Sequence, residues 1–93
     1  MTAVPGAPPP PALPTDVRVV LLTKPGCHLC DDVRPVVERV CTEAGATWTE
    51  VDIRSDAALL EEYWEQIPVT FVDGTQHEFW RIDEERLRAA LSP

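Results

Sequence analysis

The chain has 93 residues, a formal net charge of −8 and a hydrophobic fraction of 44%, which suits a single domain. The acidic balance argues against a nucleic-acid-binding protein, because such proteins present a basic surface to the phosphates. No apolar run approaches the about 18 residues of a membrane span, and the N-terminus has neither the basic segment nor the leucine-rich run of a secretory signal. We therefore expect a cytoplasmic protein that binds neither nucleic acid nor membrane.

The first 15 residues differ in composition from the rest of the chain. They carry no charged side chain and are crowded with proline, at Pro5, Pro8, Pro9, Pro10, Pro11 and Pro14. Such a segment has too little apolar surface to offset its ordering entropy, so we expect residues 1–15 to form a disordered proline-rich tail. The predicted folded domain is residues 16–93, with its folding unit ending near Leu91.

Residues 17–22 are almost continuously apolar, which is typical of a central strand covered by helices on both faces. A Pro-Gly pair then ends this strand. From His28 the apolar side chains recur at helical spacing as far as Ala44, and Gly45 suits the C-terminal cap. This order predicts a strand, a tight turn and a long helix, with Pro35 inside the helix.

A second strand and a second helix are expected next. Residues 47–53 alternate in character, and their short connection to the first helix predicts a right-handed parallel crossover. Ser55 can cap a second helix that ends near Gln66. The predicted buried face of that helix consists of four large side chains, Leu59, Leu60, Tyr63 and Trp64.

The last third of the chain reads as a hairpin and a helix. Residues 69–72 and 75–80 have strand composition, and the Asp73-Gly74 pair between them is a strong signal for a two-residue turn. Asp83 can cap a last helix. The order is therefore β-α-β-α-β-β-α, an α/β (α+β) fold around a four-stranded mixed sheet, with helices on both faces.

Two of the three cysteines are separated by two residues, in Cys27-His28-Leu29-Cys30, where the predicted turn meets the first helix. A helix N-terminus stabilises a thiolate, so this position favours ionisation of Cys27, with Cys30 one turn further along. In a reducing compartment a close pair indicates catalysis or metal binding rather than a structural disulfide. Cys41 lies on the same helix about 16 Å from Cys30 by the helix rise, and it is either a core residue or a regulatory thiol.

Four features of the chain stand in the order typical of one superfamily: Lys24, the Cys27–Cys30 pair, Pro35 and Pro68. With them the chain resembles a glutaredoxin-like member of the thioredoxin superfamily over residues 17–91. The resemblance implies a thioredoxin-like fold and thiol–disulfide exchange. In that chemistry Cys27 attacks a disulfide, and Cys30 resolves the mixed disulfide that results.

The charged neighbours of the pair are expected to tune it. Lys24 and a protonated His28 would favour the Cys27 thiolate, whereas Asp31 and Asp32 would oppose it, because nearby anions raise the pKa of a thiol. The alternative for His28 is an ordinary exposed histidine.

A second implied site element is Ile67-Pro68. In the family a proline at the position of Pro68 is held in the cis form and would lie against the disulfide, while the backbone of Ile67 would pair with an extended substrate. The alternative is that Pro68 only begins a strand, a position that proline tolerates.

The chain departs from the glutaredoxin pattern at two places. His28-Leu29 stands where glutaredoxins with two active-site cysteines have Pro-Tyr, and residues 80–83 (WRID) stand where many have the Gly-Gly-x-Asp stretch that holds glutathione. Asp83 can still supply a carboxylate there, and Arg81 can meet a glycyl carboxylate. The expected reductant is therefore open between glutathione, a mycothiol-like thiol and a thioredoxin reductase.

The leading hypothesis is a monomeric thiol–disulfide oxidoreductase with no bound cofactor and no metal, acting on disulfide-bearing proteins or small-thiol substrates. One alternative is a metal module, in which the two thiolates bind zinc with His28 or His77, or two chains share an iron–sulfur cluster. A structural zinc site requires four ligands, and the chain has a single Cys-x-x-Cys pair. The other alternative is a thioredoxin-fold binding domain with an idle dithiol, which presents Trp80 and the hairpin to a partner.

Overall fold

The computed structural model describes residues 12–92, and its elements follow the predicted order. The strands are β1 (Val19–Thr23), β2 (Trp48–Asp52), β3 (Val69–Val72) and β4 (Thr75–Phe79). The helices are α1 (His28–Ala44), a 3-10 turn η1 (Ile53–Ser55), α2 (Ala57–Tyr63) and α3 (Glu84–Leu91). The four strands form one sheet in the order β2-β1-β3-β4, with β1 parallel to β2 and the other neighbours antiparallel. The predicted mixed-sheet fold is confirmed.

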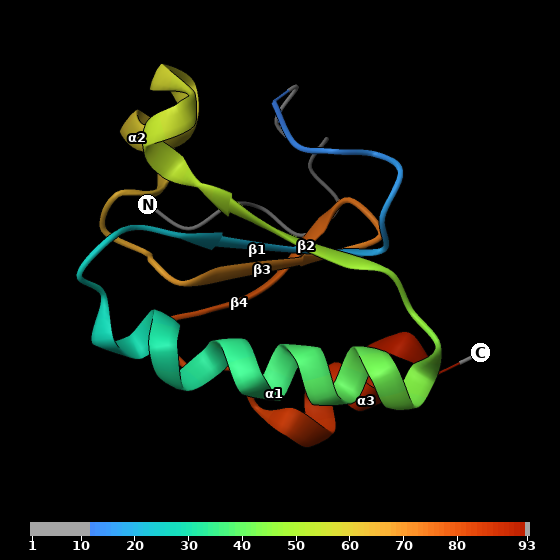
Figure 1. Cartoon of the computed structure of the whole chain (residues 1–93). Coiled ribbons are helices and arrows are strands. Elements are labelled where there is room, and N and C mark those ends of the chain that lie inside the picture. Colours follow the sequence, from blue (N-terminus) through green and yellow to red (C-terminus); the bar gives the residue numbers. More distant parts are fainter. Residues whose placement is uncertain (1–11, 93) are drawn as a thin grey trace.

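Helices cover both faces of the sheet. Helices α1 and α3 lie side by side on one face, and α2 lies on the other face toward the end where β1 leads into α1 (Figure 1). Strand β1 explains this arrangement, because all five of its residues are buried. Val19 and Leu21 pack with α1 and α3, whereas Val20 and Leu22 belong to the cluster on the α2 face. Within residues 12–92, no helix is long and apolar enough to cross a membrane.

The second helix differs from the prediction in its cap and in its buried face. Residues Ile53–Ser55 form the η1 turn, so the cap of α2 is Asp56, whose carboxylate accepts hydrogen bonds from the backbone N–H groups of Ala58 and Leu59. Ser55 is therefore not the cap.

Only half of the predicted buried face of α2 is buried. Leu59 and Tyr63 lie in the core, whereas Leu60 is 43% exposed and Trp64 is 57% exposed. A seven-residue helix contacts the sheet along one narrow stripe, which the i, i+4 pair Leu59 and Tyr63 fills.

The hairpin forms at the predicted turn. Asp73 and Gly74 both have positive φ, 51° and 85°, which is the backbone of a type I′ turn. Strand β4 ends at Phe79, one residue earlier than predicted, because Trp80 also adopts a positive φ of 65°.

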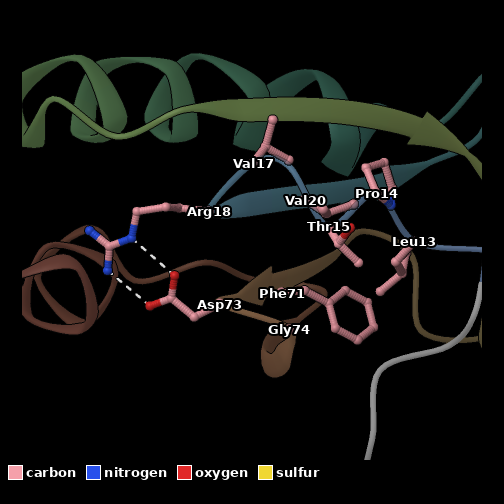
Figure 2. Close-up of a pocket in the computed structure, with 9 residues that line it drawn as sticks. All are labelled: Leu13, Pro14, Thr15, Val17, Arg18, Val20, Phe71, Asp73 and Gly74. Carbon is pink, nitrogen blue, oxygen red and sulfur yellow. Dashed lines mark hydrogen bonds and ion pairs between the residues drawn. The ribbon is translucent and has the colours of Figure 1, made fainter.

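The packed part of the chain begins before the predicted domain boundary. Leu13 is only 5% exposed and belongs to the core cluster on the α2 face, although it falls inside the predicted tail of residues 1–15. It lines a pocket of about 340 Å³ together with Phe71 (Figure 2). At the far side of this pocket the Arg18 guanidinium donates two hydrogen bonds to the Asp73 carboxylate, at 3.0 and 2.9 Å. The rest of the predicted tail, residues 1–11, lies outside the described residues.

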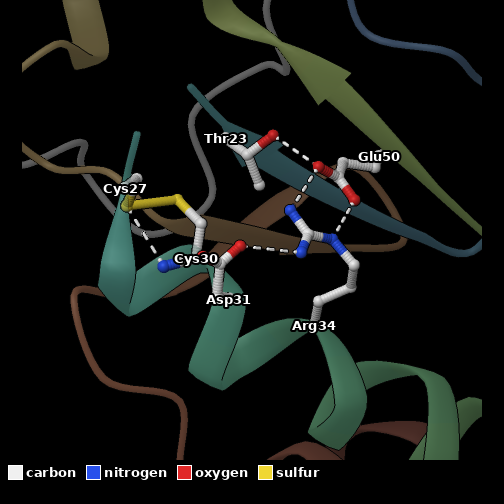
Figure 3. Close-up of a disulfide and its surroundings, with 6 residues drawn as sticks. All are labelled: Thr23, Cys27, Cys30, Asp31, Arg34 and Glu50. Carbon is white, nitrogen blue, oxygen red and sulfur yellow. Dashed lines mark hydrogen bonds and ion pairs between the residues drawn. A yellow bond between two sulfur atoms is a disulfide. The ribbon is translucent and has the colours of Figure 1, made fainter. Parts of the chain in front are cut away.

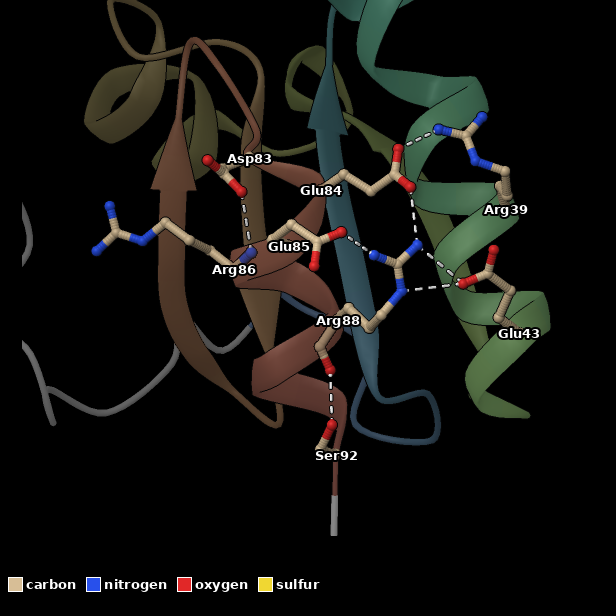
Figure 4. A network of polar contacts seen from close by, with 8 residues as sticks. All are labelled: Arg39, Glu43, Asp83, Glu84, Glu85, Arg86, Arg88 and Ser92. Atoms are coloured by element: carbon tan, nitrogen blue, oxygen red, sulfur yellow. Dashed lines mark hydrogen bonds and ion pairs between the residues drawn. The ribbon is translucent and has the colours of Figure 1, made fainter.

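Helix α3 is fixed by its cap and by ion pairs to α1. The Asp83 side chain accepts a hydrogen bond from the Arg86 backbone N–H at 3.0 Å, which confirms the predicted cap. Arg88 reaches Glu43 of α1 as well as two glutamates of its own helix, and Arg39 of α1 pairs with Glu84 (Figure 4). These contacts are partly exposed, so their individual contribution to the free energy of folding is small, but they join α1 to α3 at one edge.

Candidate functional site

Cys27 and Cys30 occupy the start of helix α1 as predicted. Cys27 is the N-cap residue, with φ −93° and ψ 110°, and its Sγ accepts a hydrogen bond from the backbone N–H of Cys30 at 3.1 Å. The two Cα atoms are 5.3 Å apart and the sulfur atoms form a disulfide (Figure 3). Cys27 is half-buried, whereas Cys30 is only 1% exposed. Cys27 is therefore the more accessible residue of the pair.

The backbone favours negative charge on this sulfur. The first N–H groups of a helix have no partner within the helix and form the positive end of its dipole. At Cys27 one of these groups is directed at Sγ, and N–H groups at a helix N-terminus favour the thiolate form of a cysteine. Gly26, with φ 74°, provides the left-handed turn that brings the chain from β1 into this cap.

A polar network lies beside the disulfide, and Asp31 is its only member to which the sequence analysis gave a role. The Arg34 guanidinium donates to both oxygens of Glu50, at 2.6 and 2.9 Å, and to Asp31 at 3.0 Å. Glu50 also accepts a hydrogen bond from the Thr23 hydroxyl at 2.8 Å (Figure 3). The network thus connects the first turns of α1 to the end of β1 and the middle of β2. The Arg34 guanidinium holds the pKa of the Glu50 carboxyl below its usual range.

The sequence contains only a weak signal for this network. Asp31 and Arg34 are three residues apart, which places them together on a helix. The contact with Glu50 requires knowing that β2 lies beside β1 under the same helix.

Substituting Arg34 with methionine is expected to reduce stability in a pH-dependent manner. Because the pKa of Glu50 is depressed in the folded protein, its contribution is fully present above the unfolded value of about 4.3 and is lost as pH falls through the folded value. We expect Arg34→Met to lose up to about 1 kcal/mol at pH 7 and less at pH 3, measured by urea unfolding. Arg86→Met is the matched control, because it removes a side chain that is 73% exposed and whose ion pair with Glu78 is long, at 4.0 Å. An equal loss at both pH values would show that only the packing of the Arg34 stem matters.

Ile67 and Pro68 lie in the same region as the cysteine pair. Ile67 and Cys30 belong to one core cluster, against which Cys27 packs. The Ile67–Pro68 peptide bond is cis, and Pro68 is fully buried. Its carbonyl accepts a hydrogen bond from the Trp80 backbone N–H at 2.8 Å. The chain around Pro68 is thereby tied to the segment that follows β4.

This arrangement matches a known family of domains. A family model described as a glutaredoxin-like domain (DUF836) matches residues 18–92. The chain belongs to this glutaredoxin-like domain family. An uncharacterized protein of Mycobacterium tuberculosis is 32% identical over 80 residues, which cover 81% of this chain and 82% of that protein. An uncharacterized protein of Mycobacterium bovis gives the same values.

Solved structures agree with the assignment. An X-ray structure of a structural-genomics target from X. campestris is similar with a TM-score of 0.59 at 32% identity, covering 81% of this chain and 99% of that chain. A solution structure from Nitrosomonas europaea gives a TM-score of 0.70 at 22% identity, covering 86% and 98%. The crystal structure of wheat glutaredoxin gives 0.51 at 22% identity, covering 83% and 81%. The last two similarities, both at 22% identity, establish the fold alone.

The remaining predicted site residues of this glutaredoxin-like domain are exposed. Lys24 lines a shallow polar pocket of about 360 Å³ together with Arg34 and Glu50, and His28 is the first residue of α1. Arg81 and Asp83 follow Trp80, and one oxygen of the Asp83 carboxylate is engaged in capping α3. The roles proposed for these four residues stay predictions.

Cys41 is separate from the dithiol of the glutaredoxin-like domain. It is fully buried in the cluster between α1 and α3, and burial raises the pKa of its thiol to about 11. Of its two predicted roles the structure supports that of a core residue. Within residues 12–92 no group of three or more His, Cys, Asp or Glu side chains is placed to hold a metal ion, so neither His28 nor His77 completes a ligand set with the pair.

Proposed function

We propose that this glutaredoxin-like domain is a thiol–disulfide oxidoreductase of the reducing cytoplasm that reduces disulfides of proteins or small thiols. One observation carries the proposal. Cys27 is half-buried and its Sγ accepts a backbone N–H at the start of α1, while the buried Cys30 lies within disulfide distance of it. An accessible sulfur with a stabilised anion, backed by a protected second thiol, is what a two-step exchange requires.

The reaction runs from the dithiol form. The Cys27 thiolate attacks one sulfur of the substrate disulfide, forms a mixed disulfide and releases the other sulfur as a thiolate. Cys30 then loses its proton and attacks Cys27 Sγ, which forms the Cys27–Cys30 disulfide and releases the second substrate thiol. Two electrons pass to the substrate. A low-molecular-weight thiol such as glutathione or a mycothiol-like thiol, or a thioredoxin reductase, must return them.

Neighbouring residues are proposed to support these steps. Lys24 and protonated His28 would add positive charge near Cys27. Ile67 would offer its backbone to an extended substrate beside Pro68, and Arg81 with Asp83 would contact the charged ends of a small thiol. The positions of Ile67 and Pro68, in the same part of the core as Cys30, support the first of these substrate contacts.

A redox titration tests the proposal. The purified protein is equilibrated in dithiothreitol buffers of defined potential, and free thiols are alkylated and counted by intact mass. We expect one reversible two-electron transition that involves Cys27 and Cys30 and leaves Cys41 reduced. Stoichiometric zinc or iron in the purified protein would instead support the metal module. A dithiol that exchanges no faster than free cysteine would support the idle binding domain.

A further inference from the structure

Three of the four exposed large apolar side chains of residues 12–92 gather at one corner of the molecule. Within residues 12–92 the exposed large hydrophobic residues are Leu29, Leu60, Trp64 and Trp80, with exposed fractions of 43%, 43%, 57% and 52%. Leu29 lies between the two active-site cysteines. The other three, which we call the tryptophan patch, lie on α2, at its end and directly after β4. Large exposed apolar side chains that gather in one place indicate an interaction surface.

Hydrogen bonds connect the members of the tryptophan patch. The Trp64 backbone N–H donates to the Leu60 carbonyl at 3.2 Å, so these two side chains are i, i+4 neighbours on one side of the helix. The Trp80 indole N–H donates to the Glu65 carbonyl at 2.8 Å, which holds Trp80 against the end of the same helix. An edge contact with Phe79, with ring centroids 5.0 Å apart, restrains it further.

The tryptophan patch is connected to the region of the dithiol through Pro68. The backbone N–H of Trp80 donates to the Pro68 carbonyl, and Ile67 on the other side of this proline is in one cluster with Cys30. In Figure 1, α2 lies at the end of the sheet where β1 leads into α1. A substrate held by Cys27 therefore lies within reach of this corner.

The same corner carries unpaired negative charge. Glu61, Glu62 and Glu65 are exposed, and none of them forms an ion pair with a residue of the described chain. Most carboxylates of α3 and of the strands, in contrast, have arginine partners. Arg81 beside Trp80 is a single exposed cation, so the net charge of the corner stays negative.

We propose that the tryptophan patch docks a basic, apolar segment of a protein substrate next to the disulfide that Cys27 attacks. This inference rests on the proposed function and specifies its substrate class. Charge complementarity selects the occupant, because the three carboxylates attract lysine and arginine, and a guanidinium also stacks on an indole face. A second copy of this chain would bring the same carboxylates and a further charge of −8, and an anionic membrane would be repelled.

A single-turnover comparison of two peptides tests the inference. Both peptides have the same length, one leucine and one intramolecular disulfide. In the basic peptide, lysine and arginine flank the disulfide. In the acidic peptide, aspartate and glutamate take their places. The protein is reduced and desalted, so that its own dithiol supplies the two electrons: each turnover yields one peptide dithiol and one Cys27–Cys30 disulfide. At low ionic strength we expect the basic peptide to be reduced about 10-fold faster or more, with the ratio falling as salt is raised.

Variants identify the surface responsible. Glu61→Gln and Trp64→Ala should each lower the rate for the basic peptide and leave the rate of Cys27 alkylation by iodoacetamide unchanged. Glu38→Gln, which removes an exposed and unpaired carboxylate of α1, is the matched control and should leave both rates unchanged.

The outcomes separate the two proposals. If neither peptide is reduced, the proposed function fails. If both are reduced at equal rates, or if Trp64→Ala and Glu61→Gln have no effect, the proposed function stands and the docking inference is overturned. Sedimentation of the wild type and of Trp64→Ala tests the second copy as occupant, because a dimer that this substitution dissociates would also overturn the inference.

Discussion

The Cys27→Ser protein is expected to reduce no disulfide above the rate of the buffer alone. The nucleophile in thiol–disulfide exchange is a thiolate, and a serine hydroxyl in the same place stays protonated. Cys30 cannot replace it, because its side chain is only 1% exposed and its sulfur is covered by the cluster that includes Ile67 and Tyr63. The measurement is single-turnover reduction of a disulfide-bonded peptide, which is monitored through the appearance of the free thiols of the peptide.

The matched control for this loss is Cys41→Ala, which removes the third thiol and leaves the pair intact. Cys41 is fully buried, and the pKa of its thiol is raised to about 11, so we expect its removal to leave the exchange rate unchanged. Retained exchange in Cys27→Ser together with loss in Cys41→Ala would move the nucleophile to Cys41 and contradict the assignment.

The features that were predicted correctly depend on residues close together in the chain. The cap of α1 at Cys27, its end at Gly45 and the hairpin at Asp73-Gly74 each follow from a few neighbouring side chains and their backbone preferences. The same is true of the cap of α3 at Asp83. Because the cysteine pair is itself one of these local features, the position of the candidate site could be predicted together with the fold.

The features that were missed depend on contacts between distant segments. Helical spacing predicted that Leu60 and Trp64 lie on the buried face of α2. How many side chains of that face are buried depends on how much of the helix surface the sheet contacts, and this cannot be read from the spacing. Leu13 has proline-rich neighbours, and no pattern in the sequence around it indicates that it packs in the core cluster that includes Phe71 of β3. The pairing of Arg34 with Glu50 joins residues 16 positions apart, and it exists only because β2 returns parallel to β1 under α1.

The corrections also change how the site is understood. Had Trp64 and Leu60 been buried, Trp80 would be the one exposed member of the tryptophan patch. With both exposed, the surface combines aromatic area with carboxylates, which is what the proposed docking of a basic, apolar segment requires. The absence of the Gly-Gly-x-Asp stretch at residues 80–83 agrees with this view, because Trp80 occupies its first position and its side chain is held in place by Glu65.

The Cys30→Ser protein is expected to stop halfway, with one substrate molecule bound to Cys27 through a mixed disulfide. The first step is retained because the hydrogen bond to Cys27 Sγ comes from the backbone N–H of residue 30 and not from its side chain. The second step is lost because no other thiol of the described chain can reach Cys27, Cys41 being buried on another part of α1. Intact mass spectrometry after exposure to a disulfide-bonded peptide should show one adduct per chain, and dithiothreitol should release it.

The adduct must also map to Cys27, and the double variant Cys27→Ser/Cys30→Ser serves as the control that forms none. Full release of both peptide thiols by Cys30→Ser, without added thiol, would show that resolution does not need the second cysteine. An adduct on Cys41 would be equally incompatible with the assignment. A stable adduct on Cys27 alone would establish the order of the two steps, because the half-buried Cys27 would have reacted first and the buried Cys30 would be required only to complete the exchange.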